Sequence, residues 1–235
     1  MRQKEQKSDD IVAFTDKDFR DLSPAERADL KVRLQSARYV TVDGVFVAEN
    51  RSKYEAARDF CKELKACKVL CAWGHTVFLL PFDYARDACG NQKKAADTLT
   101  DGEFLELKET DRNIRGNYNK AIGQGKDVLL YVTGDVNRQF AINEMMREIG
   151  NIRKQQGAGK KTVDLAGNVY IYLEKRHEML LLRIKTSGVI AEDDPRLGAL
   201  PLHNHHTPQG SRHLYHTDFF AERQGVVPWL ARAKR

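Results

Sequence analysis

The stretch ADTLTDGEFLELKE, residues 96–109, contains a turn signal between two short runs of alternating side chains. The dipeptide Asp101-Gly102 supplies the positive φ angles of a tight hairpin, so the chain can reverse its direction there. Such a hairpin brings Asp97, at the start of the first strand, beside Glu106 of the second. The stretch therefore predicts two antiparallel strands with a pair of acidic side chains at the same level.

The second strand of this hairpin has one charged face and one apolar face. Because alternate residues of a strand share a face, Glu106 and Lys108 point one way and the neighbouring leucines point the other. The carboxylates of Asp97 and Glu106 would repel each other unless a divalent cation with oxygen ligands binds between them. Lys108 would then orient a water molecule or neutralise charge that develops on a phosphate. The alternative is an amphipathic edge strand whose charged face is solvated.

The composition favours a nucleic-acid partner without proving one. The chain has 235 residues, with 39 Lys and Arg against 33 Asp and Glu, which gives a formal net charge of +6 and a pI near 9.1. A basic balance of this kind favours a polyanionic partner, and nucleic acid is the first candidate. A well-solvated basic surface is the alternative. The length predicts one main domain with extensions.

Targeting signals and cysteine usage indicate an intracellular protein. No stretch approaches the ~20 apolar residues of a membrane helix, and the N-terminal MRQKEQKSDD lacks the apolar run of a signal peptide. We therefore expect a soluble, cytoplasmic protein with no membrane span. Cys61, Cys67, Cys71 and Cys89 lack the CxxC spacing of a zinc cluster and do not suggest a disulfide framework. We interpret them as small core residues in a reducing compartment.

Periodicity and turn signals predict alternating helices and strands. SPAE at 23–26 is a capping-box start for a helix that runs to Ala37, and a DG pair at 43–44 predicts a β-hairpin over 39–49. Apart from the hairpin at 96–109, the remaining predicted elements are a helix over 52–73, a strand from 75 that Pro81 ends, a loop over 82–95, a basic helical stretch over 112–125, a strand over 127–133, a helix over 137–156, and strands over 168–174 and 178–185.

The predicted organisation has three parts: an N-terminal helix and β-hairpin extension (1–50), an α/β domain (51–187) and an irregular, His-rich tail (188–235). Prolines and glycines make the tail irregular. Five of the seven histidines fall between His203 and His216. We expect solvated histidines there, or a tail that binds phosphates when protonated, rather than a zinc site or an HNH nuclease motif.

A third acid is expected from the helix over 52–73. Glu63 shares the apolar stripe of that helix with two cysteines and a leucine, so it should point inward and need a partner. A metal ion would be one partner, and contact with Lys65 or Arg58 at the helix edge is the alternative. Glu55 lies roughly opposite the stripe and forms a capping-box pattern with Ser52, which favours a structural role.

These segments together match a known family. ELKACKVLCAWGHTVFLLP, then Asp97, then DGEFLELKE, a basic helix with Gln124 and the strand DVLLYVTG resemble the PD-(D/E)xK nuclease superfamily over residues 60–135. Within it they look most like the C-terminal tRNA-nuclease domains of contact-dependent growth-inhibition toxins. The resemblance implies an α/β, restriction-endonuclease-like core, a mixed central sheet flanked by helices.

The resemblance also implies a metal site and a set of catalytic residues. Glu63, Asp97 and Glu106 would hold Mg²⁺ or Mn²⁺, and Lys108 would complete the catalytic group. Where the family often has Pro-Asp, this chain has Ala96 before the aspartate, which removes a rigidifying residue but no ligand. The following helix would contact phosphates, unless it is merely a solvated surface. Its candidates are Arg112, Arg115, Asn117, Lys120 and Gln124.

The function expected from the resemblance is metal-dependent hydrolysis of phosphodiester bonds, with RNA of the tRNA type favoured over DNA. The protein would be a bacterial toxin, with an acidic immunity protein as its partner, or a phage-borne or mobile-element nuclease. The alternatives are a DNA-specific nuclease and a phage or mobile-element structural or nucleic-acid-binding protein with an inactive nuclease-like fold.

Overall fold

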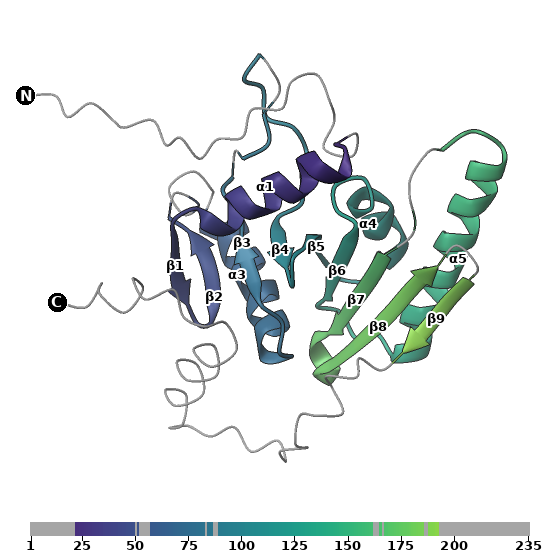
Figure 1. Ribbon diagram of the computed structural model, residues 1–235. Coiled ribbons are helices and arrows are strands. Elements are labelled where there is room, and N and C mark those ends of the chain that lie inside the picture. The colour runs from purple at the N-terminus through teal and green to yellow at the C-terminus, as the bar shows by residue number, and fades with distance from the viewer. Residues whose placement is uncertain are drawn as a thin grey trace, which may run out of the picture.

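The computed structural model describes residues 22–49, 51, 57–82, 84–86, 89–161, 165, 167–185 and 188–192. Within these residues, nine strands form one sheet whose spatial order follows the chain (Figure 1). The strands are β1 (Tyr39–Val42), β2 (Val45–Ala48), β3 (Val77–Leu79), β4 (Thr98–Thr100), β5 (Glu103–Thr110), β6 (Asp127–Val132), β7 (Gly167–Leu173), β8 (Glu178–Lys185) and β9 (Gly188–Glu192). The helices are α1 (Pro24–Ser36), α3 (Ala57–Ala72), α4 (Ile114–Ala121) and α5 (Arg138–Gly157), and a 3-10 turn, η2 (Glu174–Arg176), follows β7.

The sheet is mixed and carries helices on both faces. Strands β3 to β5 form an antiparallel meander, whereas β5, β6 and β7 run parallel and are connected through α4 and α5. Helix α3 packs on one face of the sheet, and α4 and α5 pack on the other. Helix α1 covers that second face over β3 to β5, against Leu80, Leu99 and Phe104. The predicted α/β class, with a mixed sheet flanked by helices, is confirmed.

Helices α3 and α4 belong to crossovers of opposite hand. The strands β2 and β3 are parallel neighbours, as are β5 and β6, and all four point the same way. Both connections step across the sheet in the same direction, yet α3 lies on one face and α4 on the other. One of the two connections is therefore left-handed, which is rare among crossovers between parallel strands.

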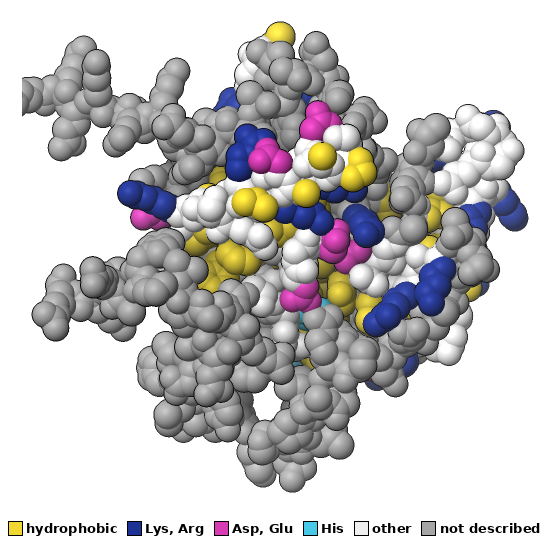
Figure 2. All heavy atoms as spheres, viewed as in Figure 1, with side chains coloured by type: hydrophobic (Ala, Val, Ile, Leu, Met, Phe, Trp, Pro, Cys, Tyr) yellow, Lys and Arg dark blue, Asp and Glu magenta, His cyan; other side chains and the backbone are white. Residues whose placement is uncertain are grey.

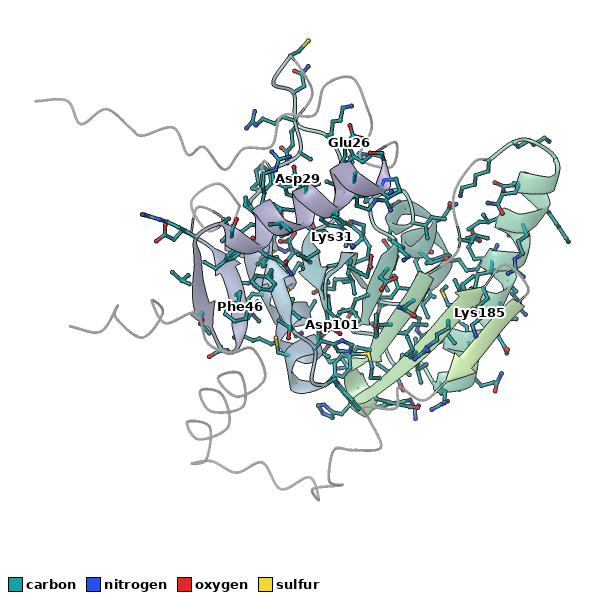
Figure 3. The ribbon with its side chains drawn as sticks, viewed as in Figure 1. Glu26, Asp29, Lys31, Phe46, Asp101 and Lys185 are labelled. Carbon is teal, nitrogen blue, oxygen red and sulfur yellow. The ribbon has the colours of Figure 1, made fainter. Side chains whose placement is uncertain are left out.

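Helix α1 begins at the predicted capping box. The Ser23 hydroxyl accepts a hydrogen bond from the backbone N–H of Glu26 at 3.3 Å, and the Glu26 carboxylate accepts one from the Ser23 N–H at 2.8 Å. Lys31, labelled in Figure 3, forms a 3.1 Å ion pair with Glu103 and so connects α1 to β5. Figure 2 shows Lys and Arg side chains interleaved with Asp and Glu over α1.

Both predicted Asp-Gly hairpins are confirmed. The φ angles are 48° at Asp43 and 85° at Gly44, and 50° at Asp101 and 83° at Gly102. These positive values twist each turn to match its strands. The Asp101 carboxylate, labelled in Figure 3, also lies 2.8 Å from Nδ1 of His75, so the tip of the β4–β5 hairpin is attached to the segment that follows α3.

The structure corrects parts of the predicted organisation. Residues Gly188–Glu192, at the start of the predicted irregular tail, form β9 against β8. The hairpin predicted as an N-terminal extension pairs with β3 and joins the same sheet. The two differences have different reasons. The pairing of β2 with β3 depends on a strand that lies beyond α3 and leaves little local pattern, whereas β9 forms a local hairpin with β8 that the glycines and prolines of this region obscure.

The predicted burial of the cysteines is half right. Cys67 and Cys71 are buried on α3, whereas Cys61 and Cys89 are exposed. A helix has an outer face as well as an inner one, and Cys61 lies on the outer face of α3. The predicted loop over 82–95 contains one isolated bridge.

Several sequence predictions lie outside the described residues. They concern the Ser52 and Glu55 capping box, the His203 to His216 cluster and the rest of the tail beyond 192. In the part of the chain that the structure describes, no helix is both long enough and apolar enough to cross a bilayer.

Candidate functional site

Glu106 lies in the middle of the sheet. Its strand, β5, pairs with β4 on one side and with β6 on the other, and Glu106 is completely buried. The alternative interpretation of this strand as a solvated edge strand is therefore wrong. Its apolar face packs toward α3 through Leu105 and Leu107. Glu106 and Lys108 point to the opposite face, as the alternation predicts.

Asp97 lies opposite Glu106, as the hairpin predicts. The register pairs Thr98 with Leu105, and Asp97 is one residue before this pair. Its carboxylate Oδ2 accepts a hydrogen bond from the backbone N–H of Leu107 at 3.1 Å. The two acids are thus held by the backbones of adjacent strands.

Two side chains contact one oxygen of Glu106. Lys108 forms an ion pair and hydrogen bond with Oε1, and the amide of Gln124 donates to the same oxygen at 2.9 Å. The other oxygen, Oε2, is buried and has no hydrogen-bond partner among the described residues. A buried acceptor without a partner costs stability, so Oε2 favours either a proton, which it can share with Asp97, or a cation.

The environment keeps the proton on Glu106 at neutral pH. Burial and, to a smaller extent, the nearby charge of Asp97 raise the pKa of Glu106 from 4.5 to about 9, although the ammonium of Lys108 opposes both effects. A carboxyl with a strongly raised pKa beside a second acid is typical of functional sites.

Gly125 lets the turn after α4 approach Glu106. A Cβ atom at this position would lie 2.9 Å from the backbone nitrogen of Glu106 and 3.0 Å from the backbone oxygen of Asp127. The first distance is shorter than real contacts of a Cβ atom, and the second is tighter than nearly all of them. Only glycine therefore allows the turn that carries Gln124 to lie directly against β5.

Arg51 connects the other two acids. Its Nη2 forms an ion pair with Oε2 of Glu63 and lies 3.8 Å from Oδ1 of Asp97, and its Nη1 donates to the backbone oxygen of Leu80 at 2.7 Å. Glu63 therefore points inward, as the helical wheel predicts. Its partner is Arg51 rather than the Lys65 considered from the sequence, because Lys65 pairs with Glu174.

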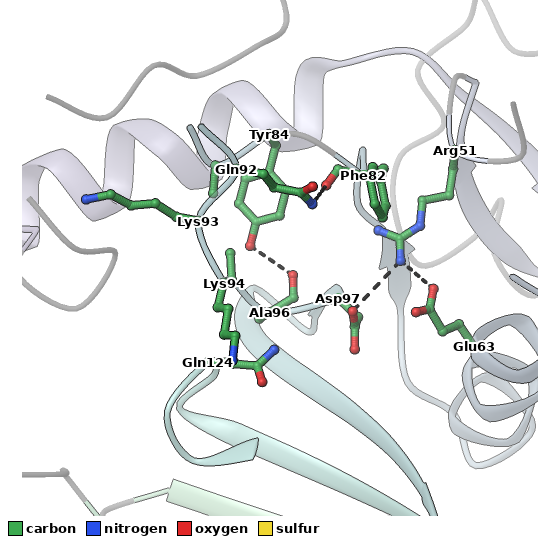
Figure 4. Close-up of a pocket in the computed structure, with 12 residues that line it drawn as sticks. Arg51, Glu63, Phe82, Tyr84, Gln92, Lys93, Lys94, Ala96, Asp97 and Gln124 are labelled. Carbon is green, nitrogen blue, oxygen red and sulfur yellow. Dashed lines mark hydrogen bonds and ion pairs between the residues drawn. The ribbon is translucent and has the colours of Figure 1, made fainter. Parts of the chain in front are cut away.

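Glu63 and Asp97 line a cavity of about 330 Å³, shown in Figure 4. The hydroxyl of Tyr84 donates to the backbone oxygen of Ala96 at 2.9 Å, so one wall of the cavity is fixed directly before Asp97. Gln124 lines the cavity and also contacts Glu106, which lies behind it. The full lining is Arg51, Glu63, Phe82, Tyr84, Ala85, Gln92, Lys93, Lys94, Ala95, Ala96, Asp97 and Gln124.

The residues predicted to contact nucleic acid separate into two groups. Gln124 lines the cavity. Arg115 instead pairs with a glutamate of α5 at 3.3 Å, and Arg112 and Asn117 donate to backbone oxygens at 3.3 and 3.0 Å. Lys120 is exposed in the last turn of α4. The site thus receives its amide from the turn after α4, while the helix itself contributes a charged outer surface.

The donor set fits a divalent cation only in part. Within the described residues, no group of three or more His, Cys, Asp or Glu side chains is arranged to hold a metal ion. Two carboxylates nevertheless face each other at Asp97 and Glu106, and one buried oxygen of Glu106 has no hydrogen-bond partner among the described residues. Hard cations prefer such oxygens. Arg51 and Lys108 provide the positive charge beside the acids in this structure.

Sequence reasoning missed Arg51, Phe82, Tyr84 and the lysines at 93 and 94. Arg51 precedes the capping-box pattern and belongs to no motif, and the others fall in the predicted loop over 82–95. Only the density of lysine and aromatic residues in that loop could have indicated a binding surface. Comparisons with known protein families, with curated proteins and with solved structures found no match for this chain.

Proposed function

We propose that the protein is a metal-dependent nuclease that hydrolyses phosphodiester bonds at the site around Glu106. The observation that carries this proposal is the buried Glu106 on a central strand, with Asp97 opposite it and Lys108 two residues further along the same face. Paired acids and a lysine are the groups that metal-assisted phosphodiester hydrolysis requires. Burial of an ionisable group at the centre of a sheet otherwise only costs stability.

The order of the elements supports the same proposal. Helix α3 carries Glu63 and precedes the β3–β4–β5 meander, which carries Asp97, Glu106 and Lys108. Helix α4 and the parallel strand β6 follow. The resemblance to PD-(D/E)xK nucleases expects a helix glutamate, an aspartate and a Glu-x-Lys triplet to meet in this way.

Asp97 and Glu106 would hold the cation, with Glu63 reaching it when Arg51 moves away. A bound Mg²⁺ or Mn²⁺ supplies Lewis-acid polarisation of the phosphate and a water of lowered pKa. Gln124 orients the Glu106 carboxylate through its hydrogen bond to Oε1. Lys108 is placed to stabilise negative charge on the phosphate or to position the attacking water.

The substrate class and the partners rest on the resemblance and on charge. We propose RNA of the tRNA type as the preferred substrate. A formal net charge of +6 favours such a polyanion. If the protein acts as a toxin, its immunity protein should present an acidic face to this basic chain.

One assay tests the proposal. Purified protein is incubated with tRNA, ribosomal RNA and plasmid DNA, in Mg²⁺ or in EDTA, and the products are separated on gels. We expect cleavage of tRNA that depends on the metal, and a loss of several orders of magnitude in rate for Glu106→Gln and Lys108→Met.

The matched control is Glu103→Gln, at the start of the same strand. Glu103 is 42% exposed and pairs with Lys31 rather than with the site. The Glu103→Gln substitution should leave the cleavage rate unchanged. A folded Glu106→Gln protein that cleaves as fast as the wild type would show that the acidic pair is not a catalytic site.

A further inference from the structure

An aromatic ring lies exposed in the wall of a polar cavity. Phe82 lines the cavity and keeps 39% of its surface exposed, although the cavity around it contains mostly charged and amide side chains. The guanidinium carbon of Arg51 lies 5.9 Å from the centre of the Phe82 ring (Figure 4). An exposed aromatic face beside cations is the arrangement that binds unpaired bases by stacking.

Cations outnumber acids around the same cavity. Among its twelve lining residues, the cations are Arg51, Lys93 and Lys94 and the acids are Glu63 and Asp97. Arg51 lies between the two acids and contacts both. The charged side chains that line the cavity therefore sum to one net positive charge. Lys94 extends toward Gln124, whereas Lys93 extends away from Phe82 (Figure 4). A lysine ammonium group is suited to a phosphate group.

The segment that carries Phe82 and the lysines is held by its own hydrogen bonds. The amide of Gln92 donates to the backbone oxygen of Phe82 at 2.7 Å, and the backbone N–H of Lys93 donates to the oxygen of Ala85 at 2.9 Å. These bonds hold the backbone at Phe82 and at Lys93 in place before any ligand binds. Such preorganisation lowers the entropy cost of binding.

We infer that the cavity binds one unpaired nucleotide, with its base stacked on Phe82 and its phosphate on the side of Lys94. The inference rests on the proposed function and specifies its substrate as single-stranded nucleic acid. The volume of about 330 Å³ suits one small ligand and not a duplex. A paired base cannot stack on a protein ring unless it leaves the helix first.

Binding measured without metal tests this inference separately from cleavage. A labelled single-stranded RNA and a blunt hairpin of similar length, whose paired strands are joined by a non-nucleotide linker, are titrated with protein in EDTA, and fluorescence anisotropy is recorded. Phe82→Ala should weaken binding of the single strand roughly tenfold or more, because one base–aromatic stack is lost. Binding of the hairpin should not change.

Phe140→Ala is the matched control. Phe140 lies on α5 and is 41% exposed, nearly the same fraction as Phe82, but it is not part of the cavity wall. The Phe140→Ala variant should bind both RNAs as the wild type does. Phe82→Trp restores an aromatic face and should recover most of the lost affinity. Lys94→Gln should reduce the slope of log affinity against log salt by up to about 0.7 for the single strand.

Two results would overturn the inference: equal effects of Phe82→Ala and Phe140→Ala, or a hairpin that binds as tightly as the single strand. Circular dichroism confirms that each variant is folded. If the single strand binds through Phe82 and no RNA is cleaved in Mg²⁺, the proposed catalysis fails while the binding site stands. If RNA is cleaved and Phe82→Ala has no effect on binding, the inferred base-binding site fails while the proposed catalysis stands.

Discussion

Glu106 makes the stability of the protein depend on pH. Its pKa is raised from 4.5 to about 9 in the folded state, so between these values the folded protein holds a proton that the unfolded chain has lost. Stability contributed by this neutral carboxyl is complete below about pH 4.5 and is lost as the pH rises toward 9. In EDTA, Glu106→Gln should therefore be more stable than the wild type at pH 8. The difference should grow by about 1.4 kcal/mol per pH unit inside this window.

Urea unfolding of both proteins from pH 5 to pH 9 measures this difference. In Mg²⁺ the difference should shrink, since only the wild type can gain stability from a cation that binds Glu106. Glu103→Gln serves again as the control and should show no such pH-dependent difference. A wild type and Glu106→Gln variant with parallel stability profiles would mean that Glu106 does not titrate in this range.

Arg51 should contribute to stability more than surface arginines do. It is 4% exposed, and its removal leaves Glu63 and Asp97 without their shared cation. Arg51→Met should cost about 2 kcal/mol, a value between those of exposed and buried ion pairs because both acids keep some contact with solvent. Mg²⁺ should raise the melting temperature of this variant more than that of the wild type.

The control for Arg51 is Arg33→Met on α1. Arg33 pairs with Asp29 one helical turn away, and both side chains are more than half exposed. Its replacement should change stability by less than about 0.5 kcal/mol. Circular dichroism recorded during thermal unfolding gives the stability of both variants. Similar small losses of stability would exclude a structural role for Arg51.

The turn between α4 and β6 requires glycine at its closest point to β5. In Gly125→Ala, the new methyl group would meet two backbone atoms that cannot rotate away. We expect a loss of about 2 kcal/mol or more and a weakened Gln124 contact to Glu106. Gly150→Ala on α5 meets nothing within 4 Å and should stabilise the protein by up to about 1 kcal/mol. If chemical unfolding shows Gly125→Ala to be more stable than Gly150→Ala, the close approach of Gly125 to the backbone of β5 would be contradicted.

Local signals explain which elements the sequence predicts correctly. The β4–β5 hairpin depends on Asp101 and Gly102 and on alternation within a few residues, and the register that places Asp97 opposite Glu106 follows from that turn. The capping box at Ser23 and the predicted strand over 127–133 likewise depend on residues that are close together in the sequence. For such elements, neighbouring residues contain most of the information that the fold uses.

Features that depend on distant partners could not be predicted. Arg51 meets Asp97 only because β3 and α3 bring two separate segments together. The pairing of β2 with β3 and the opposite hands of the α3 and α4 crossovers likewise depend on the whole sheet. The cavity wall at Phe82 is formed by a loop, whose path the periodicity of side chains does not constrain.

The whole molecule has hydrophobic clusters on both faces of one sheet. Leu129 and Leu130 are neighbours on β6, both fully buried, but one faces the α3 cluster and the other faces the α4 and α5 cluster. Because both clusters share the sheet, we expect them to unfold together. Leu129→Ala and Leu130→Ala should each cost about 2–5 kcal/mol and leave a single transition.

Two probes test this cooperativity. Trp73 packs against the α3 cluster, so its fluorescence, in a Trp229→Phe background, reports on one face, whereas far-ultraviolet circular dichroism reports on all elements. The midpoints of the two signals should coincide in both leucine variants. A variant in which the tryptophan signal changes first would show that the two faces unfold separately.

The agreement between strand order and chain order has a consequence for folding kinetics. Each strand pairs with its neighbours in the sequence, so no strand has to insert between two that have already paired. Low separation between paired segments favours rapid folding. The shortest closures are the two Asp-Gly hairpins and the β8–β9 hairpin, and β4–β5 is the one at the centre of the sheet. Pairing that starts there would place Asp97 opposite Glu106 at its first step, before β6 and α4 arrive to bury them.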